Sequence, residues 1–199
     1  MARSSIPGRG LNFGSVVKVF YAELTNLQFT ATVTDAQTGT VKTYKNTSGD
    51  CGAIDESAFA GDAPGAGAKR GRLGTFMGGR DPAIEKRGSC VAGGGTLCLL
   101  GGRFAAHVTW MNQFDNTSGK GTPRNLSDES GLFSFTDPTD VELVMKVVEF
   151  PDRATFFYGA LSDFEYDITV TDTVGGGTKA YHNPAGNYCG GLDNNAFPP

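Results

Sequence analysis

The sequence predicts an all-β protein built as an antiparallel β-sandwich, and three observations carry this prediction. Apolar and polar residues alternate at a period of two, as they do in strands with one buried face. Glycine accounts for 29 of the 199 residues, about double its usual share of roughly 7%, and Gly-rich turns separate the alternating segments. The two ends of the chain also repeat the same residues in the same order. The expected type is immunoglobulin-like, preceded by a truncated repeat of the same unit.

The repeat aligns residues 20–59 with residues 157–197. Both segments contain the sequence TVTD, at Thr32–Asp35 and at Thr169–Asp172. After one inserted residue in the second segment, Cys51-Gly52 meets Cys189-Gly190. Upstream, VVKV at Val16–Val19 resembles VMKV at Val144–Val147, so we expect the first copy to begin near residue 16 and to lack the first half of the unit.

These boundaries divide the chain into four parts. We expect an N-terminal tail at residues 1–15, a partial repeat at 16–59, a Gly-rich basic linker at 60–89 and a complete module at 90–199. The linker composition is typical of a solvated, protease-sensitive connection. A strip that binds polyanions is the alternative interpretation of its basic residues.

The individual strands follow from the alternation, taken in chain order. Residues 27–36 place Leu27, Phe29, Ala31 and Val33 on one face, and residues 103–114 do the same with Phe104, Ala106, Val108 and Trp110. Residues 131–138 form a short strand, and residues 141–150 turn Glu142 and Lys146 outward. Residues 164–173 alternate again. TDAQTGTVKTY and TDTVGGGTKAY each predict a β-hairpin.

The four cysteines favour disulfides, because no C-x-x-C spacing suggests a zinc site. Cys90 and Cys98 flank a short Gly-rich turn and are expected to pair, which leaves Cys51 with Cys189 to tie the two copies together. Two other connectivities stay open: Cys51–Cys90 with Cys98–Cys189, and Cys51–Cys98 with Cys90–Cys189. Disulfides favour an oxidising compartment. The N-terminal residues lack the apolar stretch of a secretory signal, so the chain either stays inside the cell or is a piece of a longer exported one.

Several phrases of the second copy carry a resemblance to a known kind of module. TLCLLGGRF, VTW, SGLFSFTDPTDVELVMKV, FYGALSDFEYDITVTDT and YHNPAG, within Cys90–Asn187, resemble a repeated β-sandwich module of bacterial secreted or surface proteins. The resemblance implies export, repetition within longer chains and a β-sandwich. It brings no established activity.

No catalytic constellation is visible, so we do not expect an enzyme, although a small hydrolase remains a rival hypothesis. Both histidines, His107 and His182, are expected on outer faces. The turns around Asp128, Asp137 and Asp140 are candidates for a calcium site, the only cofactor that the sequence suggests. The aromatic residues Trp110, Phe157, Tyr158 and Tyr181 are expected in the core, with a sugar-stacking platform as the alternative.

Charge and hydropathy limit the partners. A net charge of −4 argues against nucleic-acid binding, which needs a basic face, and no apolar run is long enough to insert into a membrane. We expect a non-catalytic structural or adhesive module at the cell surface or outside the cell, contacting other surface-protein domains or glycans. The alternatives are a carbohydrate-binding module, assisted by calcium, and a subunit of a strand-exchanging surface fibre, a homo-oligomer formed through the partial repeat.

Overall fold

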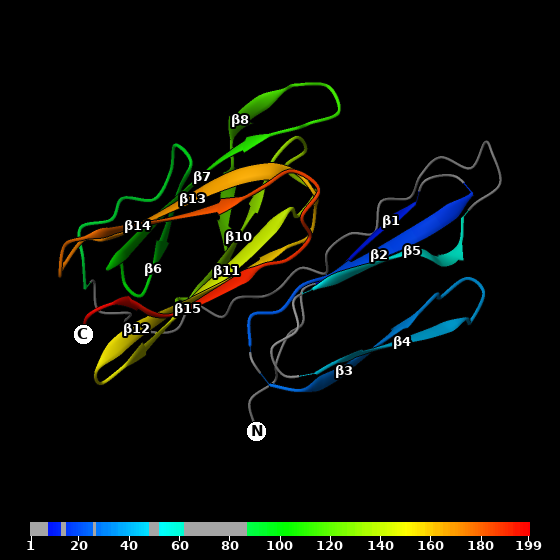
Figure 1. The fold of residues 1–199 in the computed structure, drawn as a ribbon, viewed down its shortest axis with the longest axis horizontal. Coiled ribbons are helices and arrows are strands. Elements are labelled where there is room, and N and C mark those ends of the chain that lie inside the picture. The colour runs from blue at the N-terminus through cyan, green and yellow to red at the C-terminus, as the bar shows by residue number, and fades with distance from the viewer. Residues whose placement is uncertain (1–7, 13–14, 26, 48–51, 62–86) are drawn as a thin grey trace.

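The computed structural model describes residues 8–12, 15–25, 27–47, 52–61 and 87–199, which form strands and turns without a helix. We call residues 8–61 the N-terminal unit and residues 87–199 the C-terminal unit; they lie side by side (Figure 1). The strand pairs are antiparallel, which confirms the predicted all-β antiparallel class. Within the described ranges, no helix is long and apolar enough to cross a membrane.

The C-terminal unit consists of two sheets that face each other as layers (Figure 1). One sheet has the strand order β15-β12-β11-β10-β9, and the other has the order β14-β13-β7-β6, with β8 paired to β7. The strands are β6 (Thr96–Leu99), β7 (Phe104–Met111), β8 (Ser118–Lys120), β9 (Thr122–Asn125), β10 (Ser130–Ser134), β11 (Leu143–Phe150), β12 (Arg153–Ala160), β13 (Glu165–Asp172), β14 (Thr178–Asn183) and β15 (Gly191–Phe197).

The predicted alternation decides which side chains fill the space between these sheets. In β7, Phe104, Ala106 and Val108 are buried whereas His107 is exposed. The core combines residues of both sheets, among them Leu97, Phe104, Phe133, Leu143, Met145, Phe156, Tyr166, Ile168 and Val170. Burying each of these large apolar side chains stabilises the fold by about 1.5–3 kcal/mol, so this cluster holds the unit together.

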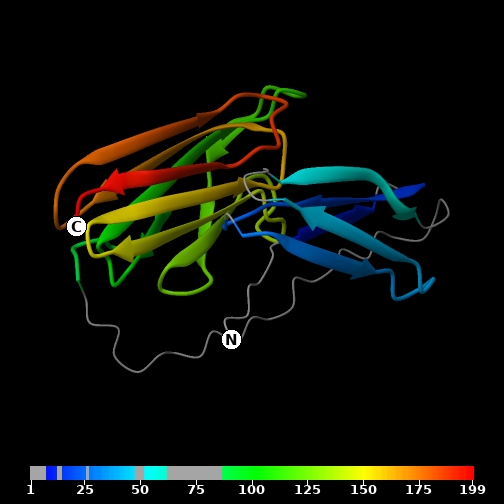
Figure 2. The same ribbon diagram turned by 60° about the horizontal axis from the view of Figure 1, so that its bottom comes forward.

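The N-terminal unit has fewer strands, arranged in two layers beside the sandwich (Figure 2). One layer has the order β1-β2-β5 and the other is the hairpin β3-β4. Their bounds are β1 (Gly8–Asn12), β2 (Val16–Tyr21), β3 (Phe29–Thr34), β4 (Val41–Asn46) and β5 (Ala53–Ala60). A small cluster of Val19, Ala58 and Phe59, with Val17, Val33 and Tyr44 at its margin, joins the layers.

The β3-β4 and β13-β14 hairpins turn in the same way. In both, an aspartate at the end of the first strand accepts backbone hydrogen bonds from the turn: Asp35 from Gln37, and Asp172 from Val174 and Gly175. Gly39 and Gly176 follow with φ of 74° and 77°. Only glycine adopts such angles without steric cost, which explains why both turns contain a glycine at this place.

The strand registers of the two units also coincide. β2 pairs with β5 through Val19↔Asp55, Phe20↔Ile54 and Tyr21↔Ala53, after an irregularity between Val17 and Val19. β12 pairs with β15 through Phe156↔Asp193, Phe157↔Leu192 and Tyr158↔Gly191, after an irregularity between Ala154 and Phe156. These pairs are the positions that the sequence alignment superimposes.

Two segment boundaries differ from the sequence prediction. β1 lies inside the expected tail and pairs with β2 as β11 pairs with β12. The Val16–Val19 segment, in β2, therefore corresponds to β12 and not to β11, which contains Val144–Val147. The predicted match was misleading because any two strands with period-two alternation resemble each other over four residues. At the other end of the linker, the backbone amide of Arg87 bonds Gly101 at 2.8 Å and that of Cys90 bonds Gly102 at 3.1 Å. The last residues of the expected linker thus join the C-terminal unit, and residues 62–86 lie outside the described part.

The predicted Cys90–Cys98 disulfide is present, with the two Cα atoms 5.8 Å apart. No cysteine of the described ranges is a free thiol. Cys51 lies outside the described residues, so its predicted bond to Cys189 stays a prediction.

Candidate functional site: the junction between the two units

The two units meet through apolar side chains that strict alternation would send to solvent. Phe20, the penultimate residue of β2, and Ala22, the first residue after this strand, are 7% and 1% exposed. They belong to one cluster with side chains of the C-terminal unit: Leu132, Val141, Val144 and Leu161, with Leu24, Ile54, Leu126 and Tyr188 at its margin. The outer face of β11 and its neighbours is therefore covered by the N-terminal unit.

This contact corrects the prediction that Glu142 faces outward. Glu142 is 3% exposed, and its backbone bonds Phe133 on one side and Leu161 on the other. The prediction was wrong because it assumed that one face of the segment stays in water. Val144, on the same face by alternation, belongs to the cluster with Phe20 and Ala22 of the N-terminal unit, while Lys146 remains partly exposed.

The two units approach each other closely at Gly159. A Cβ atom at this position would lie 2.7 Å from the Cβ of Ala22 and 3.2 Å from the backbone oxygen of Glu23. Real Cβ contacts are not that short, so the site requires glycine on one side and a small residue on the other. Ala22 and Gly159 are equivalent positions in the aligned segments.

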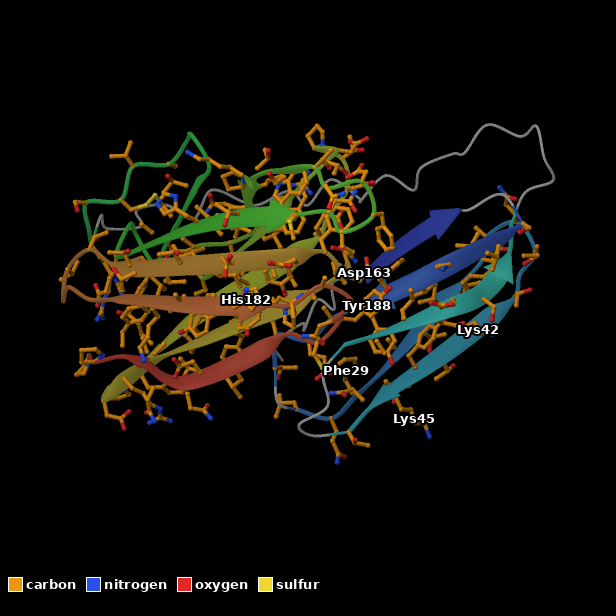
Figure 3. All side chains as sticks on the ribbon, turned by 45° about the horizontal axis from the view of Figure 1, so that its top comes forward. Phe29, Lys42, Lys45, Asp163, His182 and Tyr188 are labelled. Carbon is orange, nitrogen blue, oxygen red and sulfur yellow. A yellow bond between two sulfur atoms is a disulfide. The ribbon has the colours of Figure 1, made fainter. Side chains whose placement is uncertain are left out.

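Tyr188 completes the junction, and Figure 3 shows it beside Asp163 where the two units meet. Its ring lies 6.0 Å from that of Phe20, centroid to centroid, with the planes tilted by 46°. Burial first, and then the negative charge of Asp163, raise the pKa of the Tyr188 phenol; Glu56 of the N-terminal unit adds to this effect. The phenol therefore stays neutral, which suits a side chain that packs rather than one that gives up a proton.

A second pattern ties the two layers within each unit. Tyr44 on β4 donates a hydrogen bond of 3.0 Å to Asp55 on β5, and Tyr181 on β14 donates one of 3.0 Å to Asp193 on β15. Burial, followed by the adjacent carboxylate, raises the pKa of both phenols. Sequence reasoning did not identify these two hydrogen bonds, although a Tyr and an Asp at matched positions of the two aligned segments were a usable signal.

The C-terminal unit also contains a buried ionic cluster. Arg103, 8% exposed, donates to both carboxylate oxygens of Asp172 at 2.7–3.2 Å and to Glu149 at 2.6 Å. Its guanidinium also donates to the backbone oxygen of Pro198. Burial works to raise the pKa of Asp172, but the hydrogen bonds from Arg103 and from the turn amides outweigh it and lower that pKa. Nothing in the sequence links Arg103 to partners so far along the chain.

The acidic residues proposed for calcium lie in two separate turns. The carboxylate of Asp128 accepts a hydrogen bond of 2.8 Å from the amide of Gly101, and its backbone oxygen accepts one of 2.7 Å from the amide of Leu100. Asp137 caps the turn that contains Asp140 and bonds the amide of Thr139 at 2.8 Å. In the described ranges, no group of three or more His, Cys, Asp or Glu side chains is placed to hold a metal. The calcium site stays a prediction, with turn capping as the role that these contacts supply.

The remaining candidates have ordinary structural environments. His107 and His182 are exposed, and His182 contacts Asp167 at 2.9 Å. Trp110, Tyr158 and Tyr181 pack against the main core, with the Trp110 ring stacked on Phe135 at 5.8 Å.

An open pocket of about 400 Å³ lies between the Gly-rich turn at residues 92–96 and residues 120–125, and its lining includes Gly93, Lys120 and Asn125. It contains neither aromatic side chains nor carboxylates, so it supplies neither a stacking surface nor an acid–base pair.

Searches against protein-family models, curated proteins and solved structures return no significant match to this chain.

Proposed function

We propose that this chain is a non-catalytic structural or adhesive β-sandwich module of a surface or secreted protein, in which an incomplete copy of the unit is docked on a complete one. The observation that carries the proposal is the apolar junction around Phe20, Ala22 and Gly159. A junction of this kind gives two sandwich units a defined orientation, which is what a chain of stacked extracellular modules needs.

The chemistry of the described residues supports a structural role over a catalytic one. The strongest charge cluster, around Arg103, is committed to the fold, because its carboxylate partner Asp172 has no side-chain exposure. The tyrosines with raised pKa values act as hydrogen-bond donors between layers. The Cys90–Cys98 disulfide is typical of an oxidising compartment, which supports an extracellular or cell-surface location.

Hydrogen exchange on the full chain tests the docking. The amides of Val19 and Phe20 should exchange slowly in the wild type and faster in Gly159→Val, whose side chain cannot fit against Ala22. Random-coil exchange of these amides in the wild type would contradict the proposal.

A glycan array with and without calcium tests the main alternative. The structural proposal expects no selective sugar, whereas selective binding that is abolished by chelation would reassign the chain as a carbohydrate-binding module.

A further inference from the structure

The strand β3 has an open edge that its counterpart in the C-terminal unit does not have. β3 pairs with β4 and with no other strand of the described ranges. β13, at the aligned position, pairs with β14 on one side and with β7 on the other. The N-terminal unit therefore has a sheet edge at the place where the C-terminal unit receives a strand.

The backbone groups on this edge can be assigned from the hairpin register. The amide of Asp35 bonds the oxygen of Thr40, as the amide of Asp172 bonds the oxygen of Gly177. Hydrogen-bonded pairs alternate with non-bonded pairs in an antiparallel ladder, so Thr30, Thr32 and Thr34 point their amide and carbonyl groups away from β4. These are the groups that an added strand would use.

The inward side chains of β3 are also less buried than their counterparts on β13. Tyr166, Ile168 and Val170 on β13 are at most 1% exposed. Phe29, Ala31 and Val33, at the aligned positions, are only partly buried. In the C-terminal unit, the inward residues of β7 lie opposite these positions, with Trp110, Val108 and Ala106 facing Tyr166, Ile168 and Val170.

A charged residue also distinguishes the neighbour of β13, which is β7, from the open edge of β3. Asp172 is held by Arg103, the residue that directly precedes β7. The carboxylate of Asp35, at the aligned position, accepts hydrogen bonds from the Thr38 hydroxyl and from backbone amides of its own turn, and these bonds lower its pKa. Asp35 is thus an ionised carboxylate at the end of the open edge, and no arginine of the described ranges bonds it as Arg103 bonds Asp172.

We propose that the open edge of β3 binds an antiparallel strand from another copy of the complete, C-terminal type of unit. That strand carries the β7 pattern, which is an arginine followed by apolar residues at alternate positions. Asp35 would face its first apolar residue, and Val33, Ala31 and Phe29 would face the next three inward ones. This inference rests on the proposed function, because it requires the N-terminal unit to be an incomplete copy of the C-terminal one.

The outer edge of β4 supplies an internal control. Its counterpart β14 pairs with β13 alone within the described ranges, so the unit needs no strand there. Thr43 lies opposite Thr32 in the same non-bonded pair and directs its amide to that outer edge. Proline at Thr32 and proline at Thr43 each remove one amide donor without breaking the β3-β4 ladder.

The test uses the full chain and a fluorescent synthetic peptide with the sequence RFAAHVTWM, residues 103–111, measured by fluorescence anisotropy. We expect saturable binding that weakens by about tenfold or more in Thr32→Pro and is unchanged in Thr43→Pro. Asp35→Asn should weaken binding of this peptide but not of its Arg→Ala variant. A scrambled peptide of equal composition is the negative control.

Three results would overturn the inference. They are a peptide that does not bind or binds no better than the scrambled one, equal losses in both proline variants, and self-association of the chain that Thr32→Pro abolishes while the peptide does not bind. The last result would identify β3 of a second molecule as the occupant. Hydrogen exchange of Val19 and Phe20 on the same samples separates the two proposals. Absent peptide binding with slow exchange refutes only the proposed β7-type strand on β3, whereas fast exchange refutes the docked copy as well.

Discussion

Replacing Arg103 by methionine should destabilise the C-terminal unit more than the loss of a surface ion pair would, because the substitution leaves a buried carboxylate without its cation. Asp172 has no side-chain exposure, whereas Arg103 is 10% exposed in its side chain. Removing one partner of a buried pair costs about 3–5 kcal/mol. The amides of Val174 and Gly175, each at 3.0 Å from the carboxylate, keep part of their stabilising effect. We therefore expect a loss near the lower end, about 3 kcal/mol in the free energy of unfolding.

The direction of the pH dependence follows from the lowered pKa of Asp172. In the wild type, the stabilisation from this group is present above the unfolded pKa of about 3.9 and is lost as the pH falls through the folded value. In Arg103→Met, the hydrogen bonds from Arg103 no longer oppose the effect of burial, which raises the pKa of Asp172. Protonation of Asp172 at a higher pH then removes the buried negative charge. The stability gap between variant and wild type should therefore narrow between pH 7 and about pH 4.

Urea titration monitored by tryptophan fluorescence measures both effects, because the only tryptophan of the chain, Trp110, packs against the core of this unit. Arg153→Met is the matched control: its ion pair with Asp152 is exposed, and we expect a change below about 0.5 kcal/mol. A loss under about 1 kcal/mol in Arg103→Met, or a gap that does not change with pH, would refute the reasoning.

Three further predictions concern the junction, the disulfide and the core. Gly159→Val should release the N-terminal unit from the C-terminal unit, because the added side chain cannot fit against Ala22, while Trp110 fluorescence reports a folded C-terminal unit; unchanged exchange rates in β2 would contradict the steric argument. Replacing Cys90 and Cys98 by serine should cost about 2–3 kcal/mol, as expected for a short closed loop, and equal urea midpoints would exclude this. Tyr166→Phe should be neutral or stabilising, because the buried hydroxyl has no partner within the described residues; a loss above about 1 kcal/mol would indicate a partner.

Period-two alternation was sufficient to predict several strands and their inward faces, and β7 is the clearest case. Phe104, Ala106 and Val108 are buried as predicted, since a pleated strand sends alternate side chains to opposite faces whatever its neighbours are. The short Gly-rich loop likewise predicted the Cys90–Cys98 bond, because two residues that lie so near each other in the sequence can meet through local geometry alone.

Non-local packing produced the errors. Glu142 was predicted to face outward and is buried, because the sequence of a strand does not say whether a second unit will cover its polar face. The similarity of Val16–Val19 to Val144–Val147 suggested the wrong equivalence, because four alternating residues do not specify which neighbour a strand pairs with. Pairing with β1 and β5 does so.

By itself, therefore, the sequence determined the features that depend on local periodicity: the class of the fold, the hairpins with Asp35 and Asp172, and the short disulfide. Only the tertiary structure decided which distant groups meet. It brought Arg103 to Asp172, 69 residues away, placed Ala22 against Gly159, and paired β3 with β4 alone among the described strands. The physical reason is that backbone sterics and alternation act between neighbours in the chain, whereas ion pairs, close contacts and strand order depend on how whole layers stack.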